Sequence, residues 1–249
     1  MTPVDLHVHS NFCDGKSSPR ELVLSAINKG VKKLGILAHS YINFEPEYCL
    51  LPERKNEFLR HINELKEEFK DKITILVGIE LDFFSEIDLN GFDYVIGSVH
   101  FCYVKNKFYP VDHTLELLLQ GINEGFDGDA MALCENYFEL VSHLADKKKP
   151  DLIGHFDLLT KFNENDKIFD TTSERYKNAW KKSVDKLIEK DVVFEINTGA
   201  ISRGYRTEPY PSREIIDYIK NKGGKFMLSS DAHRADNIAF EFDKWKKLL

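Results

Sequence analysis

The sequence lacks the marks of membrane-spanning, secreted and disulfide-stabilised proteins. No uninterrupted apolar run approaches the roughly 20 residues that a membrane-spanning helix needs. The chain starts with neither a basic segment nor a long apolar run, so we expect no signal peptide. The four cysteines form no C-x-x-C pair and no dense framework, which favours reduced thiols in a cytoplasmic protein.

Excess positive charge, internal repeats and flexible linkers are also missing. The formal net charge is −7, which argues against an extended nucleic-acid surface and leaves only a local basic patch open. No Pro-, Gly- or Ser-rich linker divides the chain, so we expect one domain over residues 1–249. Apolar residues make up 42% of the chain and charged residues 30%, which is typical of a soluble globular protein with a sizeable core. We expect neither a nucleic-acid nor a membrane partner, and the sequence makes no prediction of oligomeric state.

Short runs rich in Val, Ile and Leu recur along the chain, as expected of strands buried on both faces. The predicted strands are Val4–His9, Leu34–His39, Ile73–Glu80, Tyr94–His100, Leu152–Phe156, Val192–Asn197 and Phe226–Asp231. Helical patterns lie between most of them, over residues 18–29, 53–70, 129–147, 172–190, 212–222 and 234–248. This alternation predicts an α/β protein whose parallel sheet is closed or nearly closed into a TIM-like barrel. An open doubly wound sheet is the alternative, but residues 10–15 lack the G-x-G-x-x-G loop expected after its first strand.

Polar side chains stand at or just beyond the ends of most of these strands. They are His7, His9, His39, Glu80, His100, His155, Asp231 and His233. Because the carboxyl ends of barrel strands meet at one face, we expect these side chains to converge there. The remaining histidines, His61, His113 and His143, fall in helical or loop segments and are predicted to lie on the surface.

Each of these residues alone has an ordinary structural explanation. A histidine at a strand end can be a polar residue leaving the core, and Asp231 could cap a following helix. Several imidazoles and carboxylates buried together are costly, however, unless they are paired or bind metal. In His7-Val8-His9 both rings leave the same face of the strand. Imidazole with carboxylate is the donor set of Zn²⁺, Mn²⁺ and Fe²⁺, so we expect a site for divalent metal ions.

Several short motifs follow one another between residues 5 and 233. They are DLHVHSNFCDG, LAHS, GIELDF, YVIGSVHF, IGHFDL, EINT and SSDAH. In this order they resemble the PHP family, the polymerase and histidinol phosphatase domain. GSVHF and the later EPYPS segment (Glu208–Ser212) are most similar to the stand-alone histidinol-phosphate phosphatases. The resemblance implies a distorted seven-stranded (β/α)7 barrel with up to three divalent metal ions at its carboxyl-terminal mouth.

Position by position, the resemblance also implies three sets of metal ligands. They are His7, His9, Glu80 and Asp231 for the first metal, Glu80, His100 and His155 for the second, and Asp14, His39 and His233 for the third. Glu80 would bridge two metals, and Glu80, Asp231 and His233 are the expected catalytic residues. Some relatives have a histidine where this chain has Asp14, so the third site differs from theirs in its donor set.

The activity that the resemblance implies is hydrolysis of L-histidinol phosphate to L-histidinol and inorganic phosphate, a step of histidine biosynthesis, by metal-activated water. Cations are expected near the phosphate: Lys161, Arg203 and Arg206 follow the fifth and sixth strands, although a surface position is an equal alternative for Arg206. The candidates for contact with the amine and imidazole of the leaving group are Asp157, Glu208, Tyr210, Phe101 and Phe44. Residues 40–55 and 101–128 are predicted to form lids.

Other activities stay open on the sequence alone. Another PHP phosphoesterase would act on protein tyrosine phosphate, on nucleotides or, as an exonuclease-like domain, on nucleic acid, which the net charge of −7 disfavours. Metal-dependent amidohydrolases also begin with His-x-His, but they often use a carboxylated lysine where this chain has Glu80. A barrel that only binds a partner would be expected to lack metal ligands, and none of the expected ligands is missing from this sequence.

Overall fold

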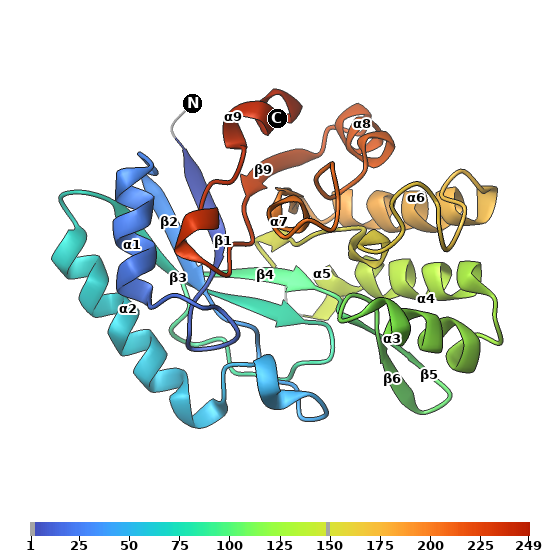
Figure 1. The fold of residues 1–249 in the computed structure, drawn as a ribbon, viewed down its shortest axis with the longest axis horizontal. Coiled ribbons are helices and arrows are strands. Elements are labelled where there is room, and N and C mark those ends of the chain that lie inside the picture. The colour runs from blue at the N-terminus through green and yellow to red at the C-terminus, as the bar shows by residue number, and fades with distance from the viewer. Residues whose placement is uncertain (1–2, 148–149) are drawn as a thin grey trace.

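Strands and helices alternate along the chain, and the strands build a barrel (Figure 1). The computed structural model describes residues 3–147 and 150–249. Within those residues the barrel strands are β1 (Val4–His9), β2 (Lys33–Leu37), β3 (Thr74–Asp82), β4 (Tyr94–Ser98), β7 (Leu152–Ile153), β8 (Val193–Asn197) and β9 (Lys225–Ser229). Neighbours in the order β1-β2-β3-β4-β7-β8-β9 are parallel. The order follows the chain without the reversal that defines a doubly wound sheet, so the predicted seven-stranded barrel is confirmed and the open sheet is excluded.

A short seam beyond the end of β9 nearly closes the barrel against β1. The amide of His9 donates to the carbonyl of Ala232 at 2.8 Å. Below this contact, the buried carboxylate of Asp5 accepts from both the amide (3.1 Å) and the hydroxyl (2.5 Å) of Ser230. The segment after β9 is therefore held directly against the His-x-His of β1, although the two lie near opposite ends of the sequence.

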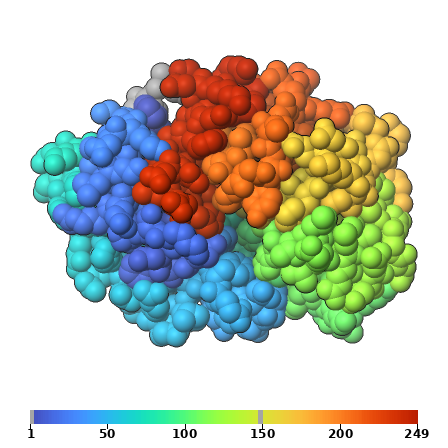
Figure 2. All heavy atoms as spheres, viewed as in Figure 1, coloured from blue at the N-terminus to red at the C-terminus, as the bar shows by residue number. Residues whose placement is uncertain are grey.

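Helices surround the barrel strands. They are α1 (Pro19–Asn28), α2 (Lys55–Phe69), α3 (Leu115–Gln120), α4 (Ala130–Ser142), α5 (Leu144–Lys147), α6 (Glu174–Ile188), α7 (Gly199–Ser202), α8 (Arg213–Asn221) and α9 (Phe242–Trp245). Helix α1 begins with a capping box in which Ser18 and Glu21 each accept a hydrogen bond from the other's backbone amide. Figure 2 shows the N-terminal third of the chain on one side of the molecule and the segments of α4 and α6 on the other. Among the described residues, none of the helices has the length and apolar character needed to span a bilayer.

A tyrosine occupies the interior of the barrel near the start of β4. The ring of Tyr94 lies against Gly35 and Gly78, where an added Cβ atom would come within 2.1 Å and 2.3 Å of Tyr94 atoms. Its hydroxyl donates to the carbonyl of Leu6. Glycine at these two positions therefore makes room for the ring, which fills this part of the barrel.

Two segments differ from the predicted elements for identifiable reasons. The predicted helix over residues 234–248 is broken into short pieces, because Ala239 and Glu241 both adopt positive φ angles of 52°. The predicted fifth strand ends at Ile153 instead of Phe156, because the amide of His155 donates to a side chain, that of Glu195, at 2.9 Å.

The segment between β4 and α4 has secondary structure of its own. It contains the antiparallel hairpin of β5 (Phe101–Val104) and β6 (Lys107–Pro110), followed by α3 and a π-helical turn over Gly121–Gly125. The predicted helix over 129–147 is divided into α4 and α5. The four cysteines, Cys13, Cys49, Cys102 and Cys134, are free thiols, as predicted.

Candidate metal centre and its cleft

Four predicted metal ligands each stand two residues beyond the end of a barrel strand. They are His39 after β2, His100 after β4, His155 after β7 and Asp231 after β9. His7, His9 and Glu80 lie within β1 and β3, and Asp14 and His233 lie on the loops that follow β1 and β9. Because side chains alternate along extended backbone, the common spacing turns them toward the same mouth. The structure therefore brings all nine candidate ligands together.

Glu80 lies at the centre of this cluster and is buried. Its Oε1 atom faces His155 Nε2 (2.8 Å) and His100 Nε2 (3.3 Å), and its Oε2 atom faces His39 Nδ1 (3.0 Å), His7 Nε2 (3.3 Å) and His9 Nε2 (3.3 Å). Burial raises the pKa of this carboxyl, but the surrounding histidines outweigh burial and hold its pKa well below the usual range. Imidazoles therefore face both oxygens of Glu80, as the predicted role of this residue as a shared ligand requires.

Asp231 completes the side of the cluster nearest to β1. Its Oδ1 atom lies 3.7 Å from His7 Nε2 and 3.6 Å from His9 Nε2. Its other oxygen, Oδ2, lies 3.0 Å from Nη2 of Arg203, which also donates from Nη1 to the carbonyl of Asp231 at 2.9 Å. Arg203 thus fixes the orientation of Asp231 as well as facing the cleft.

Asp14 lies close to three histidines on the outer side of the cluster. Its Oδ1 atom lies 3.8 Å from His9 Nδ1 and 3.7 Å from His39 Nε2, and its Oδ2 atom lies 3.1 Å from His233 Nε2. The rings of His9 and His233 are stacked with centroids 4.2 Å apart. Burial raises the pKa of Asp14, but His39 and His233 hold it well below its usual range.

The donor atoms of the cluster fit divalent metal ions. They fall into four groups with atoms within 4.8 Å of one another: His7, His9 and Asp231; His7, Glu80 and His155; His39, Glu80 and His100; and His9, Asp14, His39 and His233. The atom Asp14 Oδ1 is buried and has no hydrogen-bond partner among the described residues. Buried carboxylate oxygens without a donor are costly, and cations bound there would remove the cost. Imidazole and carboxylate donors suit Zn²⁺, Mn²⁺ and Fe²⁺.

Two buried carboxylates lie within hydrogen-bond distance of candidate ligands. Neither of them is among the site residues predicted from the sequence. Oε1 of Glu195 lies 2.6 Å from Nδ1 of His7, and Oδ2 of Asp82 lies 3.0 Å from Nδ1 of His100. Partners of this kind orient ligating imidazoles and fix their tautomers. The signal that could have identified them is an acidic residue inside a run that is otherwise typical of a buried strand.

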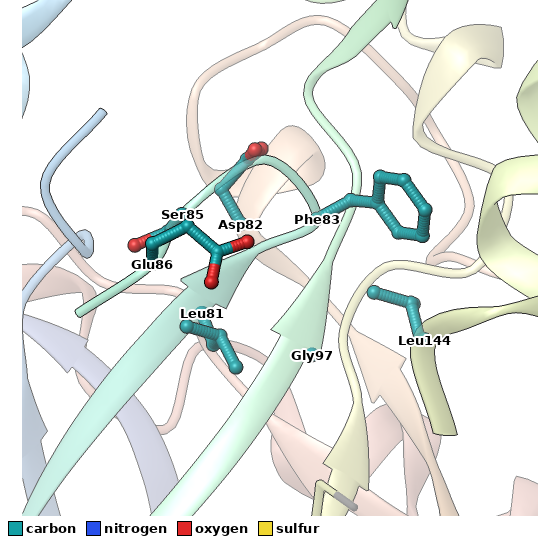
Figure 3. A pocket seen from close by; sticks show the side chains of 7 residues that line it. All are labelled: Leu81, Asp82, Phe83, Ser85, Glu86, Gly97 and Leu144. Carbon is teal, nitrogen blue, oxygen red and sulfur yellow. The ribbon is translucent and has the colours of Figure 1, made fainter. Parts of the chain in front are cut away.

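Asp82 stands where β3 passes into a turn. Figure 3 shows it beside Ser85 and Glu86, with the side chains of Phe83 and Leu144 on the other side of a small cavity of about 90 Å³. The Asp82 carboxylate also accepts from the amides of Phe84 (2.8 Å) and His100 (3.2 Å). These bonds fix both the turn and the carboxylate that faces His100.

The ligand cluster borders an open cleft of about 620 Å³. Besides ligands, the cleft is lined by Cys13, Gly15, Lys16, Glu45, Glu47, Tyr48, Asp112, His113, Leu158, Lys161, Arg203 and Tyr205. Part of this wall comes from residues 40–55 and 101–128, the segments predicted as lids. Lys161 and Arg203, two of the predicted phosphate-binding residues, are therefore at the site.

Several predicted substrate contacts do not reach this cleft. The guanidinium of Arg206 donates to Thr160 Oγ1 and lies 4.6 Å from the centroid of the Tyr210 ring, and Arg206 is not among the cleft-lining residues. The same holds for the five leaving-group candidates, Asp157, Glu208, Tyr210, Phe101 and Phe44: Asp157 and Tyr210 are buried beside the barrel, and Glu208 is exposed. His113, predicted to be a surface residue, is partly buried and lines the cleft instead.

Comparison with known proteins gives one consistent family. The PHP domain matches residues 5–199. A histidinol-phosphatase from Lactococcus lactis is 30% identical over 100% of this chain and 91% of its own length. A probable histidinol-phosphatase from Schizosaccharomyces pombe is 26% identical over 99% of this chain and 86% of its own length. The structure of a histidinol phosphate phosphatase from Lactococcus lactis complexed with zinc, L-histidinol and phosphate has a TM-score of 0.74 to this fold at 24% identity, covering 99% of this chain and 92% of that one.

Proposed function

We propose, because the chain belongs to the PHP domain family, that it hydrolyses L-histidinol phosphate to L-histidinol and inorganic phosphate. The chain would act as one metallophosphoesterase domain over residues 1–249. Three relatives named histidinol-phosphatase or probable histidinol-phosphatase match at least 98% of its length at 24–30% identity, which supports this substrate. The observation that carries the proposal is the position of Glu80 at the centre of the cluster, with imidazoles facing both of its carboxylate oxygens. The cluster borders a cleft of about 620 Å³.

We assign the ligands to three sets around Glu80 and Asp14, which would hold up to three metal ions. The first is His7, His9, Glu80 and Asp231, the second is Glu80, His100 and His155, and the third is Asp14, His39 and His233. Zn²⁺, Mn²⁺ and Fe²⁺ all suit these donors. When bound, such ions supply Lewis acidity that neutralises charge on the phosphate and makes water more acidic.

The chain's own residues bind and orient the phosphate ester. Lys161 and Arg203 line the cleft and offer N–H donors to phosphate oxygens, with Arg203 able to donate two parallel bonds. Glu80, Asp231 and His233 are the residues that we place next to the reacting phosphate. Positioning and charge neutralisation are the main requirements of phosphoryl transfer, and this cleft supplies both.

A phosphate-release screen with the zinc-loaded protein tests the proposal. The substrates are L-histidinol phosphate, phosphotyrosine, AMP and p-nitrophenyl phosphate. We expect kcat/KM for L-histidinol phosphate to exceed the others by about 100-fold, because the leaving group would contribute binding energy of roughly 2.7 kcal/mol to the transition state. Comparable values for all four substrates would leave a phosphoesterase and refute the histidinol assignment.

Two variants connect the activity to the cluster. Asp231→Asn and His9→Ala remove ligands of the first set, so both should lose nearly all turnover while keeping the circular dichroism spectrum of the wild type. An exposed residue of comparable chemistry, Asp243, provides the matched control Asp243→Asn, which should be fully active. Near-normal rates in either cluster variant would contradict the ligand assignment.

A further inference from the structure

The cleft has charged groups of both signs on its walls. Lys161 and Arg203 are the cations already described. Asp112 and Glu45 are acids on the same cleft, but they are not in any of the ligand groups and have no role in the proposed chemistry so far. A carboxylate repels phosphate, so these acids must either lie clear of the phosphate or recognise another part of the substrate.

Asp112 has an oxygen that the folded chain does not use. Its Oδ1 atom is buried and has no hydrogen-bond partner among the described residues. Its Oδ2 atom lies 3.7 Å from Nζ of Lys161, and that ammonium donates to the backbone carbonyl of Asp112 at 2.6 Å. Lys161 is thus held mainly through the main chain. A buried carboxylate oxygen without a donor is costly, which favours a bound N–H group at this point.

Glu45, on the segment of residues 40–55, lines the same cleft as Asp112. Its Oε1 atom is 3.9 Å from Nδ1 of His113, the residue that follows Asp112. The ring of Tyr48 stands edge-on to His113, with centroids 5.7 Å apart, and edge-on to the ligand His39, with centroids 4.9 Å apart. One continuous wall therefore connects the ligand cluster to the two acids.

We propose that Asp112, with Glu45 on the same cleft, binds the ammonium group of the leaving alcohol and so selects aminoalkyl phosphates. This inference rests on the proposed function and names the residues that recognise its substrate. In L-histidinol phosphate the ammonium is separated from the phosphate oxygen by only two carbons. The contact between Lys161 and Asp112 places a phosphate-binding cation next to an ammonium-binding anion, which matches that spacing.

The decisive variant is Asp112→Asn, which keeps the shape and the main-chain bond to Lys161 but removes the charge. Its kcat/KM is compared for L-histidinol phosphate and for the deamino analogue 3-(imidazol-4-yl)propyl phosphate. We expect about a 10- to 100-fold loss with L-histidinol phosphate, as for a desolvated charge-assisted bond. The analogue should change by less than about 3-fold, and the zinc content should equal that of the wild type.

Two further glutamates provide the comparison. Glu45→Gln should give a smaller selective loss, because the side chain of Glu45 is 41% exposed. Glu47 also lines the cleft but is exposed, so Glu47→Gln is the matched control. It should leave kcat/KM unchanged for both substrates. Because Glu45→Gln sits on a different segment, it keeps the proposal testable if Asp112→Asn does not fold.

The outcomes separate this inference from the proposed function. Equal losses of kcat/KM with both substrates in Asp112→Asn would mean that Asp112 acts through Lys161 on the phosphate. No loss with either substrate would mean that Asp112 does not contact the ammonium group. Either result overturns the inference. If the wild type shows no preference for L-histidinol phosphate, the proposed function fails. The role of Asp112 is then measured by the ratio of kcat/KM for 2-aminopropyl phosphate, which keeps the two-carbon spacing, to kcat/KM for propyl phosphate. This ratio should fall in Asp112→Asn, and an unchanged ratio overturns the inference.

Discussion

The Nδ1 atom of His7 lies 2.6 Å from Oε1 of Glu195, and both side chains are fully buried. This pair turns Nε2 of His7 toward Glu80 and Asp231, the two carboxylates that it would share a metal with. The second oxygen of Glu195 accepts from the amide of His155 and from Nδ2 of Asn197, both at 2.9 Å. One carboxylate therefore positions a ligand from β1 and the loop that carries a ligand after β7.

Glu195→Gln should weaken metal binding without removing a ligand. The amide cannot hold the His7 tautomer and charge as the carboxylate does, so we expect zinc affinity to fall about 10- to 100-fold. Competition with a chromogenic chelator measures this, and the exposed Glu189→Gln, at the end of α6, is the control. Wild-type zinc affinity in Glu195→Gln would show that the pair has only a structural role.

Substitutions of the two central acids should remove different numbers of metal ions. Glu80 touches two of the three assigned ligand sets, whereas Asp14 belongs to one. We expect Glu80→Gln to lose two equivalents of zinc relative to the wild type, and Asp14→Asn to lose one. Zinc per chain is measured by atomic emission after gel filtration. A full complement of zinc in Glu80→Gln would exclude its bridging position.

Lys161→Ala and Arg203→Ala should differ in their effect on metal retention. Lys161 contacts Asp112 and no assigned ligand, so its loss should raise KM by about 10-fold and leave zinc bound. Arg203 holds Asp231 by two hydrogen bonds, so its loss should lower kcat and speed zinc release as well. If the two variants have the same zinc release rate, Arg203 acts on the substrate alone.

The positions of the candidate ligands at strand ends could be predicted from the sequence because their pattern is local. His39, His100 and His155 each follow a short apolar run, and parallel strands bring such positions to one mouth whatever the details of packing. The same reasoning could not identify Glu195, whose role depends on a neighbour 188 positions away in the sequence. An acid inside a run typical of a buried strand indicates that the carboxylate has a partner, but the sequence does not say which residue that partner is.

The walls of the cleft were beyond prediction for a different reason. Asp112 and His113 reach the site because residues 101–128 fold into a hairpin and a helix that pack beside the barrel, and this depends on long-range contacts. The break in the predicted C-terminal helix could not be predicted from the sequence either. Ala239 has a positive φ angle, which alanine rarely adopts and no sequence pattern indicates. The five leaving-group candidates lie near the sequence motifs, and the structure does not bring them to the cleft.

Gly78→Ala should destabilise the protein through the barrel interior. The new Cβ atom would lie 2.3 Å from Cζ of Tyr94, so the ring or the strand must move, at a cost of about 1–3 kcal/mol or more. Tyr94→Phe, which only removes the hydrogen bond to Leu6, should cost about 1 kcal/mol. Urea unfolding of the zinc-loaded proteins measures both. A stability loss below about 0.5 kcal/mol for Gly78→Ala would contradict the close packing at this point.

The metal-free protein should be most stable near the ordinary pKa of histidine, about pH 6.5. Burial lowers the pKa of His7, His39 and His100, but nearby carboxylates, Glu80 and, for His7, Glu195, outweigh burial and raise it. The stability that these cations contribute is present below about pH 6.5 and is lost as the pH rises through their raised values. Burial and the neighbouring His233 lower the pKa of His9 to about 3, so the folded state binds fewer protons than the unfolded state at that site, and stability falls as the pH drops below about 6.5.

Urea unfolding of the EDTA-treated protein at about pH 5, 6.5 and 8.5 measures this maximum. Glu195→Gln removes the largest influence that raises the pKa of His7, so its loss of stability between about pH 6.5 and 8.5 should be smaller than that of the wild type. Zinc should reverse the high-pH trend, because metal binding requires neutral imidazoles and becomes tighter as protons leave. Metal-free stability that rises steadily from about pH 6.5 to 8.5 would contradict the presence of protonated histidines in the cluster.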